Sequence, residues 1–222
     1  MTEPKIKILP TSYFGNIYYY YELLTSNLVQ IELYENYPKQ TFRNRSNIVN
    51  SNGIICLSVP IEKKNNNFSY TKDMKISYQT DWVSYHLKTI STAYSHAPFF
   101  EYIFYDIENI LKEKHKFIID LNNQLLILIF KFLKIETSKI KYTNSYIKNY
   151  EHNIIDLRNV FKETQHNIFT QNIIFPEYNQ VFFPKLQFMK NLSIIDLIFN
   201  IGNEAFLYFN KIQNAPTKTI ST

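Results

Sequence analysis

The sequence predicts an α/β protein: an N-terminal parallel βαβ unit with an added antiparallel hairpin, followed by a mainly helical C-terminal half. Three observations predict this fold class. The first 33 residues pass from a strand pattern to a helix pattern and back, an Asn-Gly pair interrupts an apolar region near residue 52, and helical periodicity begins at residue 81. The chain has 222 residues, 45% of them hydrophobic, so it can bury a sizeable core. We expect one domain over residues 1–215, with an α/β part (1–80) and a mostly helical part (81–215), and a flexible tail over 216–222.

The N-terminal unit is predicted from three short segments. Residues 5–9 alternate in hydrophobicity and stop at Pro10, residues 17–24 follow a helical pattern, and residues 28–33 follow a second strand pattern. A strand, a helix and a strand within about 30 residues form a βαβ unit with parallel strands. The turn over residues 11–16 then lies at the carboxyl end of the first strand, where open α/β sheets bind ligands. The helix that follows would direct its first N–H groups at an anion.

A hairpin is predicted directly after this unit. Asn52-Gly53 is the strongest short-range hairpin signal, and it is flanked by residues 45–49 and 54–60. The second arm is nearly all apolar, so we expect an inner strand. Cys56 in this arm is expected to be a buried small hydrophobe rather than a nucleophile.

Helical patterns dominate from Asp81, which can cap the helix that carries Trp82 and His86 on one face. The further elements expected in this half are helices at residues 99–114, 120–134 and 156–162, a strand at 140–142, an irregular segment at 173–190, and a helix at 193–212 that is interrupted near Gly202.

Several classes of protein are not supported by the composition. The single cysteine rules out an intramolecular disulfide and a Cys-rich zinc site, and it favours a reducing, cytoplasmic compartment. No secretory signal is predicted at the N-terminus, and the longest apolar run, residues 125–130, is too short to insert into a membrane. The net charge is +5, but the lysines are spread along the chain, so nucleic acid is not the expected partner. No metal-ligand spacing and no glycine-rich phosphate motif occurs, so neither a metal nor a cofactor is predicted.

Arginine and glycine are both scarce, so the few that are present are informative. The chain has only three arginines among its 24 basic residues, and Arg43 and Arg45 lie two residues apart, close to Lys39. A guanidinium grips a carboxylate or phosphate with two parallel hydrogen bonds, which a lysine cannot do. We therefore interpret this stretch as one wall of an anion-binding site. The three glycines, including Gly15 in the first turn, mark positions that need positive φ or close approach.

The remaining candidates are a histidine and three carboxylates. His86 lies beside the only tryptophan, Trp82, and is either a general base in a pocket or a core histidine with satisfied hydrogen bonds. Asp196 follows Ser193 at the spacing of a capping box, with a catalytic carboxylate as the alternative. Glu32 and Glu35, near the end of the second strand, are either ligand contacts or solvated edge carboxylates.

The chain resembles the WbqC-like protein family. The segments that carry this resemblance are Ile8–Ile17, Glu35–Arg45, Asn52-Gly53, Leu57–Pro60, Asp81-Trp82 with His86, Ala93-Tyr94, Pro98–Tyr102, Asn191–Leu197 and Gly202. The resemblance covers nearly the whole chain with its motifs in order. It implies a role in bacterial surface-polysaccharide (O-antigen) biosynthesis, as a transferase that moves glycine or another amino acid to an amino sugar. The family has no settled catalytic residues to carry over.

On this basis we expect a small anionic substrate, such as a nucleotide sugar. Arg43, Arg45 and Lys39 would hold its phosphate or carboxylate. His86 would deprotonate the attacking amine, and Asn44 or Tyr94 would stabilise the oxyanion. The other expected ligand contacts are Tyr13, Gly15, Glu35, Asn52 and Trp82.

Two other functions remain open on sequence alone. The protein could be a non-catalytic binding or scaffold protein of the same pathway, in which the arginines pair with internal carboxylates. It could also be a HUP-like nucleotide-binding enzyme, although the histidine signature of that class is missing from residues 10–16. The oligomeric state is left open.

Overall fold

A four-stranded, fully parallel sheet organises the first part of the structure, a computed structural model that describes residues 6–62, 69–151 and 153–214. The strand order is β5-β2-β1-β6. The strands are β1 (Ile6–Pro10), β2 (Leu28–Glu32), β5 (Ile140–Tyr142) and β6 (Ile154–Asp156). β1 and β2 with the helix between them confirm the βαβ unit, and the α/β class is confirmed. Both outer strands come from the half that was expected to be mainly helical.

Helix α1 (Ile17–Leu24) joins β1 to β2, and its start is set by two residues. Gly15 adopts φ +51°, a conformation that favours glycine, and turns the chain out of the strand. Asn16 is the N-cap, because its side-chain oxygen accepts a hydrogen bond from the backbone N–H of Tyr19 at 2.8 Å. α1 buries most of its tyrosines, so this unusually aromatic helix belongs to the core.

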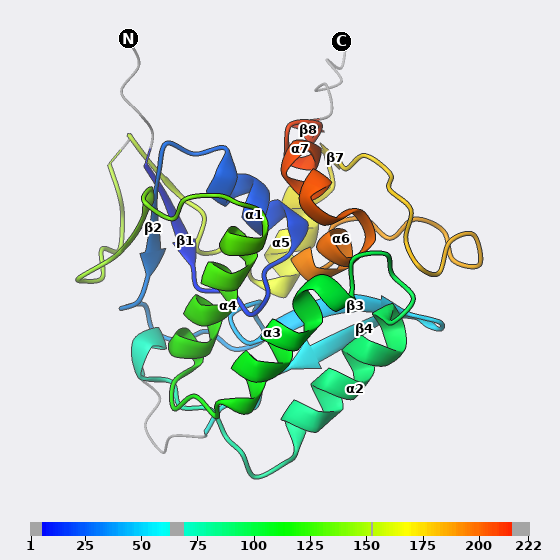
Figure 1. Cartoon of the computed structure of the whole chain (residues 1–222). Helices are drawn as coiled ribbons and strands as arrows, with labels where there is room; N and C mark the ends of the chain where they lie inside the picture. Colours follow the sequence, from blue (N-terminus) through cyan, green and yellow to red (C-terminus); the bar gives the residue numbers. More distant parts are fainter. Residues whose placement is uncertain (1–5, 63–68, 152, 215–222) are drawn as a thin grey trace, which may run out of the picture.

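The predicted hairpin is present as β3 (Arg45–Asn50) and β4 (Gly53–Ser58), paired antiparallel. It forms a separate two-stranded sheet, drawn at the lower right of Figure 1, whereas β1 and β2 lie at the left. The expectation for its second arm is wrong. Ile54 and Cys56 are exposed while Leu57 is buried, so β4 alternates and covers the core with one face only. Cys56 is therefore not a buried hydrophobe.

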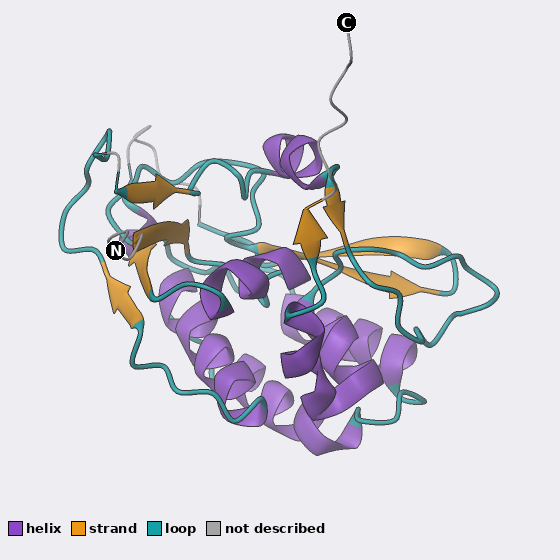
Figure 2. Ribbon diagram, turned by 90° about the horizontal axis from the view of Figure 1, so that it is seen from above, coloured by secondary structure: helices purple, strands orange, loops and turns teal. Residues whose placement is uncertain are grey.

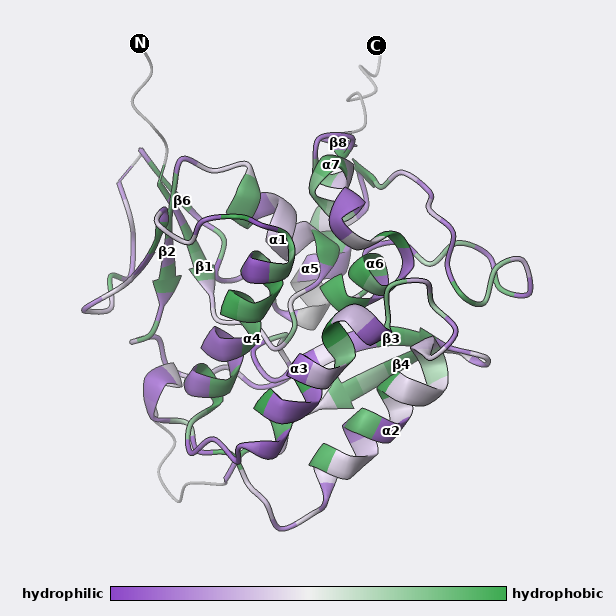
Figure 3. Cartoon of the chain, in the orientation of Figure 1, coloured by the Kyte–Doolittle hydropathy of each residue, from purple (hydrophilic) through white to green (hydrophobic). Residues whose placement is uncertain are grey.

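Most of the helices lie together beside the strands, as the view from above shows (Figure 2). They are α2 (Trp82–Tyr94), α3 (Glu101–Lys112), α4 (Ile118–Phe132), α5 (Glu163–Thr170), α6 (Ile194–Ile201) and α7 (Ala205–Phe209), with short 3-10 turns η1 (Thr71–Asp73) and η2 (Gly202–Glu204). A two-residue pair, β7 (Ile173–Ile174) and β8 (Gln213–Asn214), completes the described fold. Asp81 caps α2, as expected, by accepting from Ser84 N at 3.2 Å. α6 is largely hydrophobic (Figure 3), and all of its residues except Ile201 are buried.

The elements predicted at the C-terminal end are partly confirmed. The strand at residues 140–142 and the interruption of the last helix at Gly202 are both present. The helix expected over residues 156–162 is wrong, because residues 154–156 form β6 and the helix begins only at Glu163. The tail expected over 216–222 lies outside the described residues.

Candidate functional site

The guanidinium of Arg43 has the bidentate partner that the sequence predicts, but the partner is internal. Arg43 is 1% exposed. Its Nε and Nη2 donate to the two carboxylate oxygens of Glu35 at 2.5 and 2.8 Å, and Nη2 also donates to the backbone oxygen of Arg158 at 3.2 Å. This geometry favours the alternative in which the arginine stabilises the fold. Of the other two basic residues, Arg45 is half-buried at the start of β3, and Lys39 is exposed.

A second ion pair crosses the carboxyl end of β1. Glu32 ends β2 and Arg158 follows β6, and these two strands flank β1 on opposite sides. Arg158 Nη1 donates to Glu32 at 3.0 Å, and its Nη2 donates to Asp156 at 2.6 Å. The guanidinium also lies 4.9 and 5.0 Å from the ring centres of Tyr146 and Tyr150. Glu32 is thus fully engaged and is not a solvated edge carboxylate.

The first N–H groups of α1 are occupied by the protein itself. Ile17 N donates to the backbone oxygen of Leu192 at 2.9 Å, and Tyr18 N donates to Asn191 Oδ1 at 2.9 Å. Because Asn16 takes the next N–H, the helix start that was expected to bind an anion has no donor left for one. Gly15 takes part through its backbone oxygen, which accepts from Ile194 N at 2.8 Å.

His86 is a core histidine in this structure. It is 1% exposed, its Nδ1 lies 2.9 Å from the hydroxyl of Tyr13, and it also makes a hydrogen bond with the backbone of Ser58. Burial lowers the pKa of His86 to about 4, and the bond with Ser58 only partly opposes this. Trp82 packs edge-on against the imidazole at 5.1 Å. The imidazole is therefore neutral at pH 7 and already hydrogen-bonded.

Asp196 is a fully buried carboxylate with three donors, and the capping-box interpretation is wrong. Ser193 makes no side-chain cap, and Asp196 instead accepts from Tyr94 OH at 2.7 Å, from Gln180 Nε2 at 3.0 Å and from Tyr178 OH. Burial raises the pKa of Asp196, and the hydrogen bonds lower it again in part. Tyr94 thus holds a core carboxylate rather than facing a ligand.

The last two predicted residues are Asn44, which directly precedes β3, and Asn52, which lies in the turn between β3 and β4. Asn44 Nδ2 donates to the backbone oxygen of Val59 at 2.8 Å, and Val59 N donates to the Asn44 backbone oxygen at 2.8 Å. Asn52 lies in the exposed turn, where its N–H donates to Asn50 Oδ1 at 2.9 Å. Both residues hold the hairpin in shape.

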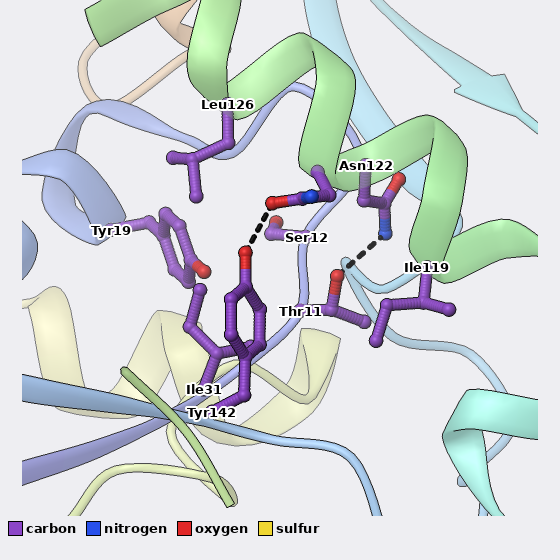
Figure 4. A pocket seen from close by; sticks show the side chains of 9 residues that line it. Thr11, Ser12, Tyr19, Ile31, Ile119, Asn122, Leu126 and Tyr142 are labelled. Carbon is purple, nitrogen blue, oxygen red and sulfur yellow. Dashed lines mark hydrogen bonds between the residues drawn. The ribbon is translucent and has the colours of Figure 1, made fainter. Parts of the chain in front are cut away.

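The carboxyl edge of the sheet holds a small cavity (Figure 4). It is lined by Thr11, Ser12, Tyr19, Ile31, Ile119, Asn122, Asn123, Leu126 and Tyr142. The volume that the centre of a water molecule can occupy in this cavity is about 10 Å³, which leaves room for about one water. Asn122 Nδ2 donates to Thr11 Oγ1 at 3.1 Å, and the half-exposed Tyr142 closes the cavity through a hydrogen bond to Asn123. The edge that α/β sheets use for ligands is filled by side chains here.

A larger hollow lies between the β3–β4 hairpin, α5 and the segment before α6. We call it the amide pocket. It has a volume of about 290 Å³ and is lined by Phe42, Asn47, Ile54, His166, Asn167, Thr170, Gln171, Lys190, Asn191 and Leu192. Phe42, which belongs to the arginine stretch, and Leu192 form an apolar floor, since both are buried. A hollow with an apolar floor and polar walls is the usual form of a small-molecule site.

His166 in the floor of this pocket is held by two asparagines. Its Nε2 lies 2.9 Å from Asn16 Nδ2 and 2.7 Å from Asn191 Nδ2, so this nitrogen accepts and the ring is neutral. Burial lowers the pKa of His166 to about 4, with the backbone of Val160 acting in the opposite direction. The same two asparagines cap α1, so the pocket floor and the helix start form one network.

The walls of the amide pocket carry polar groups with hydrogen-bonding capacity to spare. Within the described part of the chain, the side chains of Asn47, Asn167 and Gln171 make no hydrogen bond, and Asn167, Gln171 and Lys190 are exposed. Each amide can both donate and accept.

Comparisons with known proteins identify the family. The model of the WbqC-like protein family matches residues 11–166 and 143–208. The chain belongs to the WbqC-like protein family. No curated protein and no solved structure matches it. The matched residues of this WbqC-like chain include every residue that lines the amide pocket. Across the described residues there is no group of histidines, cysteines and carboxylates that could hold a metal, and no helix that could cross a membrane.

Sequence reasoning missed His166 and the amides around it in this WbqC-like protein. His166 joins Asn16, 150 positions earlier, to Asn191. The segment resemblance over Asn191–Leu197 and Ile8–Ile17 pointed to both asparagines, but it did not show that they meet. The asparagines themselves gave no signal, because the chain uses asparagine throughout.

Proposed function

We propose that this WbqC-like protein is a transferase of surface-polysaccharide biosynthesis that binds an amino sugar in the amide pocket. The observation that carries the proposal is the ring of unused side-chain amides around an apolar floor. Asn47, Asn167 and Gln171 come from two different elements and face one hollow of about 290 Å³. Sugar hydroxyls donate and accept hydrogen bonds, so amides match them, while the apolar face of the sugar ring suits Phe42.

Charge supports a sugar that carries an acidic group. Lys190 is the cation of the pocket, and its described lining contains no carboxylate. His166 adds no positive charge at neutral pH because its pKa is lowered to about 4. A phosphate, as in a nucleotide sugar, or a carboxylate would therefore lie near Lys190. We therefore propose the amide pocket rather than Arg43 as the position of the anionic group, because the Arg43 guanidinium is occupied by Glu35.

The chemistry that the family resemblance implies is amide formation. The sugar amine attacks the carbonyl carbon of an activated aminoacyl donor, the new N–C bond forms, and the leaving group departs with its electron pair. The amine proton passes to the leaving group or to solvent. Nε2 of His166 already accepts from two asparagine amides, so we propose that the pocket contributes mainly by holding the amine in line with the donor.

The direct test is to incubate the protein with nucleotide amino sugars and activated glycine, and to look by mass spectrometry for the sugar enlarged by one glycyl group. Gln171→Ala and Asn167→Ala should each reduce turnover and raise the KM for the sugar about tenfold, since each removes contacts to a polar ligand. Gln79→Ala is the matched control, because Gln79 is exposed and lies outside the amide pocket. Equal losses in Gln79→Ala and Gln171→Ala would contradict the assignment of the pocket.

A non-catalytic binding protein is the second candidate, and one observation favours it. The residues predicted to do chemistry, His86, Tyr94 and Arg43, are buried and paired with other parts of the protein. Sugar binding to the amide pocket without any product, for every donor offered, would identify the protein as a binding module. A thermal-shift screen with ATP tests the HUP-like alternative, which the occupied N-terminus of α1 disfavours.

A further inference from the structure

The last residues of the segment between β7 and α6 form one wall of the amide pocket. This segment leaves the body of the molecule as a long excursion at the right of Figure 1 and returns before α6. Lys190, Asn191 and Leu192 then line the pocket. We call residues 177–190 the strap. An excursion of this length without helix or strand needs specific contacts to hold its end in one place.

Gln180 supplies these contacts by joining the two arms of the strap. Its Oε1 accepts from Met189 N at 2.9 Å, and its Nε2 donates to the Met189 backbone oxygen at 3.0 Å. A single side chain thus satisfies both backbone groups of Met189, as a partner strand would. Gln180 is itself buried, so these bonds are shielded from water.

Asp196 anchors Gln180 to the core. The carboxylate, on α6, accepts from Gln180 Nε2 at 3.0 Å and from Tyr178 OH, and both donors belong to the strap. Its third donor, Tyr94, is on α2 and bonds at 2.7 Å. A fully buried carboxylate needs all of its donors, because an unmet acceptor costs the full desolvation penalty. The strap is therefore fixed to two helices of the body.

The pocket side of this connection is equally well defined. Asn191 accepts from Tyr18 N at 2.9 Å and donates to His166 at 2.7 Å, so it is fixed to α1 and α5. Lys190 lies between Met189, which Gln180 holds, and Asn191. The backbone position of Lys190 thus depends on Gln180 from one side and on Asn191 from the other.

We propose that Gln180, anchored by Asp196, is a positioning residue that sets the strap wall of the amide pocket and, through Lys190, its affinity for an anionic sugar. Gln180 does not line the pocket, so it acts on the ligand only through the strap. The statement about affinity rests on the proposed function, whereas the statement about the wall does not.

Hydrogen–deuterium exchange of the ligand-free protein tests the wall. In Gln180→Ala the backbone amide of Met189 loses its acceptor, so the peptide that covers residues 189–192 should exchange at least tenfold faster. Asn179→Ala, an exposed neighbour in the strap, is the control and should leave this peptide unchanged. Gln180→Met keeps the side-chain length and lacks the hydrogen bonds, so it must give the same result if Gln180→Ala is too unstable to purify. Unchanged exchange in a folded Gln180 variant would overturn the proposal.

Sugar affinity tests the coupling to Lys190. The coupling is measured by a double-mutant cycle of Gln180→Met and Lys190→Ala, with calorimetry and a nucleotide amino sugar. Each single variant should have a Kd about tenfold higher than that of the wild type, and the double variant should have a Kd hardly higher than that of either single variant. A purely structural role of Gln180 predicts that the two losses multiply, and that result would overturn the coupling. If the wild-type protein binds no sugar, the proposed function fails, and the exchange experiment still decides whether Gln180 holds the wall.

Discussion

The planar guanidinium of Arg43 donates three hydrogen bonds, two to the carboxylate of Glu35 and one to the backbone oxygen of Arg158. This explains why the chain keeps an arginine here among so many lysines. A lysine would offer one compact charge and could not bridge both carboxylate oxygens. The sequence predicted a guanidinium with a bidentate anionic partner, and the favoured partner was a ligand. The alternative, an internal carboxylate, could not be distinguished from it, because a ligand and Glu35 present the same geometry to a guanidinium.

We expect Arg43→Lys to lower the free energy of unfolding by about 2–4 kcal/mol, since it leaves part of a buried carboxylate unpaired. Urea denaturation of the two proteins measures the difference. Lys39→Ala, an exposed change in the same stretch, should stay within about 0.5 kcal/mol of wild type. A loss in Arg43→Lys no larger than that of Lys39→Ala would show that the ion pair is dispensable.

The two buried histidines predict a pH dependence of stability. The pKa values of His86 and His166 are lowered from 6.5 to about 4 in the folded protein. Between these pH values the unfolded chain binds a proton at each residue and the folded chain does not. Stability is thus full above pH 6.5 and falls as the pH drops toward 4, by about 3 kcal/mol for each histidine.

Denaturation midpoints at pH 7 and pH 5 check this sign. His166→Gln, which keeps an acceptor for Asn16 and Asn191, should be less stable than wild type at pH 7 and should lose less stability on going to pH 5. A wild-type protein that becomes more stable as the pH falls through this range would refute the argument.

At the scale of single elements, α1 is fixed at its start by Gly15. A Cβ at this position would lie 2.8 Å from ring carbons of Tyr19 and Tyr20, and its φ of +51° is unfavourable for other residues. Gly15→Ala should therefore cost about 2–4 kcal/mol. Gly53 in the hairpin also has a positive φ, of +118°, but a Cβ added there would have no atom within 4 Å. Gly53→Ala should therefore lower the free energy of unfolding clearly less than Gly15→Ala. Thermal unfolding of both variants tests the order, and equal losses would show that crowding by the tyrosines is unimportant.

The long or strongly patterned elements were predictable, and the short ones were not. The βαβ unit, the Asn-Gly hairpin and the helix at Asp81 each have a local signal that the structure confirms. β6 has three residues, and its existence depends on pairing with β1 rather than on its own sequence. Cys56, which is exposed, illustrates the same limit, because the sequence of an apolar strand does not tell whether one or both of its faces are covered.

At the scale of the whole molecule, the sheet joins the two halves of the chain. β1 and β2 come from residues 1–80, whereas their outer neighbours β5 and β6 come from the second half. We predict that a fragment of residues 1–80 does not fold, because both strands would have exposed edges and the apolar face of α1 would lack cover. Circular dichroism and the dispersion of amide proton signals check this. A fragment with a cooperative unfolding transition would show that the N-terminal part is autonomous.

The candidate site also depends on this long-range assembly. His166, Asn16 and Asn191 come from three distant parts of the sequence and meet only in the folded protein. Local patterns placed Asn16 in a turn and left Asn191 before a helix, but no spacing rule relates them. The family resemblance marked both segments, and it carried no information on which side chains touch.

The pairing of β1 with β6 has a consequence for biosynthesis. Ile6 on β1 pairs with Ile154 on β6, so one edge of β1 stays open during translation until a further stretch of about two thirds of the 222 residues has been made. At about 5–20 residues per second this delay is on the order of ten seconds. During that time the unpaired edge of β1 can form hydrogen bonds with other nascent chains. Slowed translation between the two strands should lower the soluble yield, even though the encoded protein is unchanged.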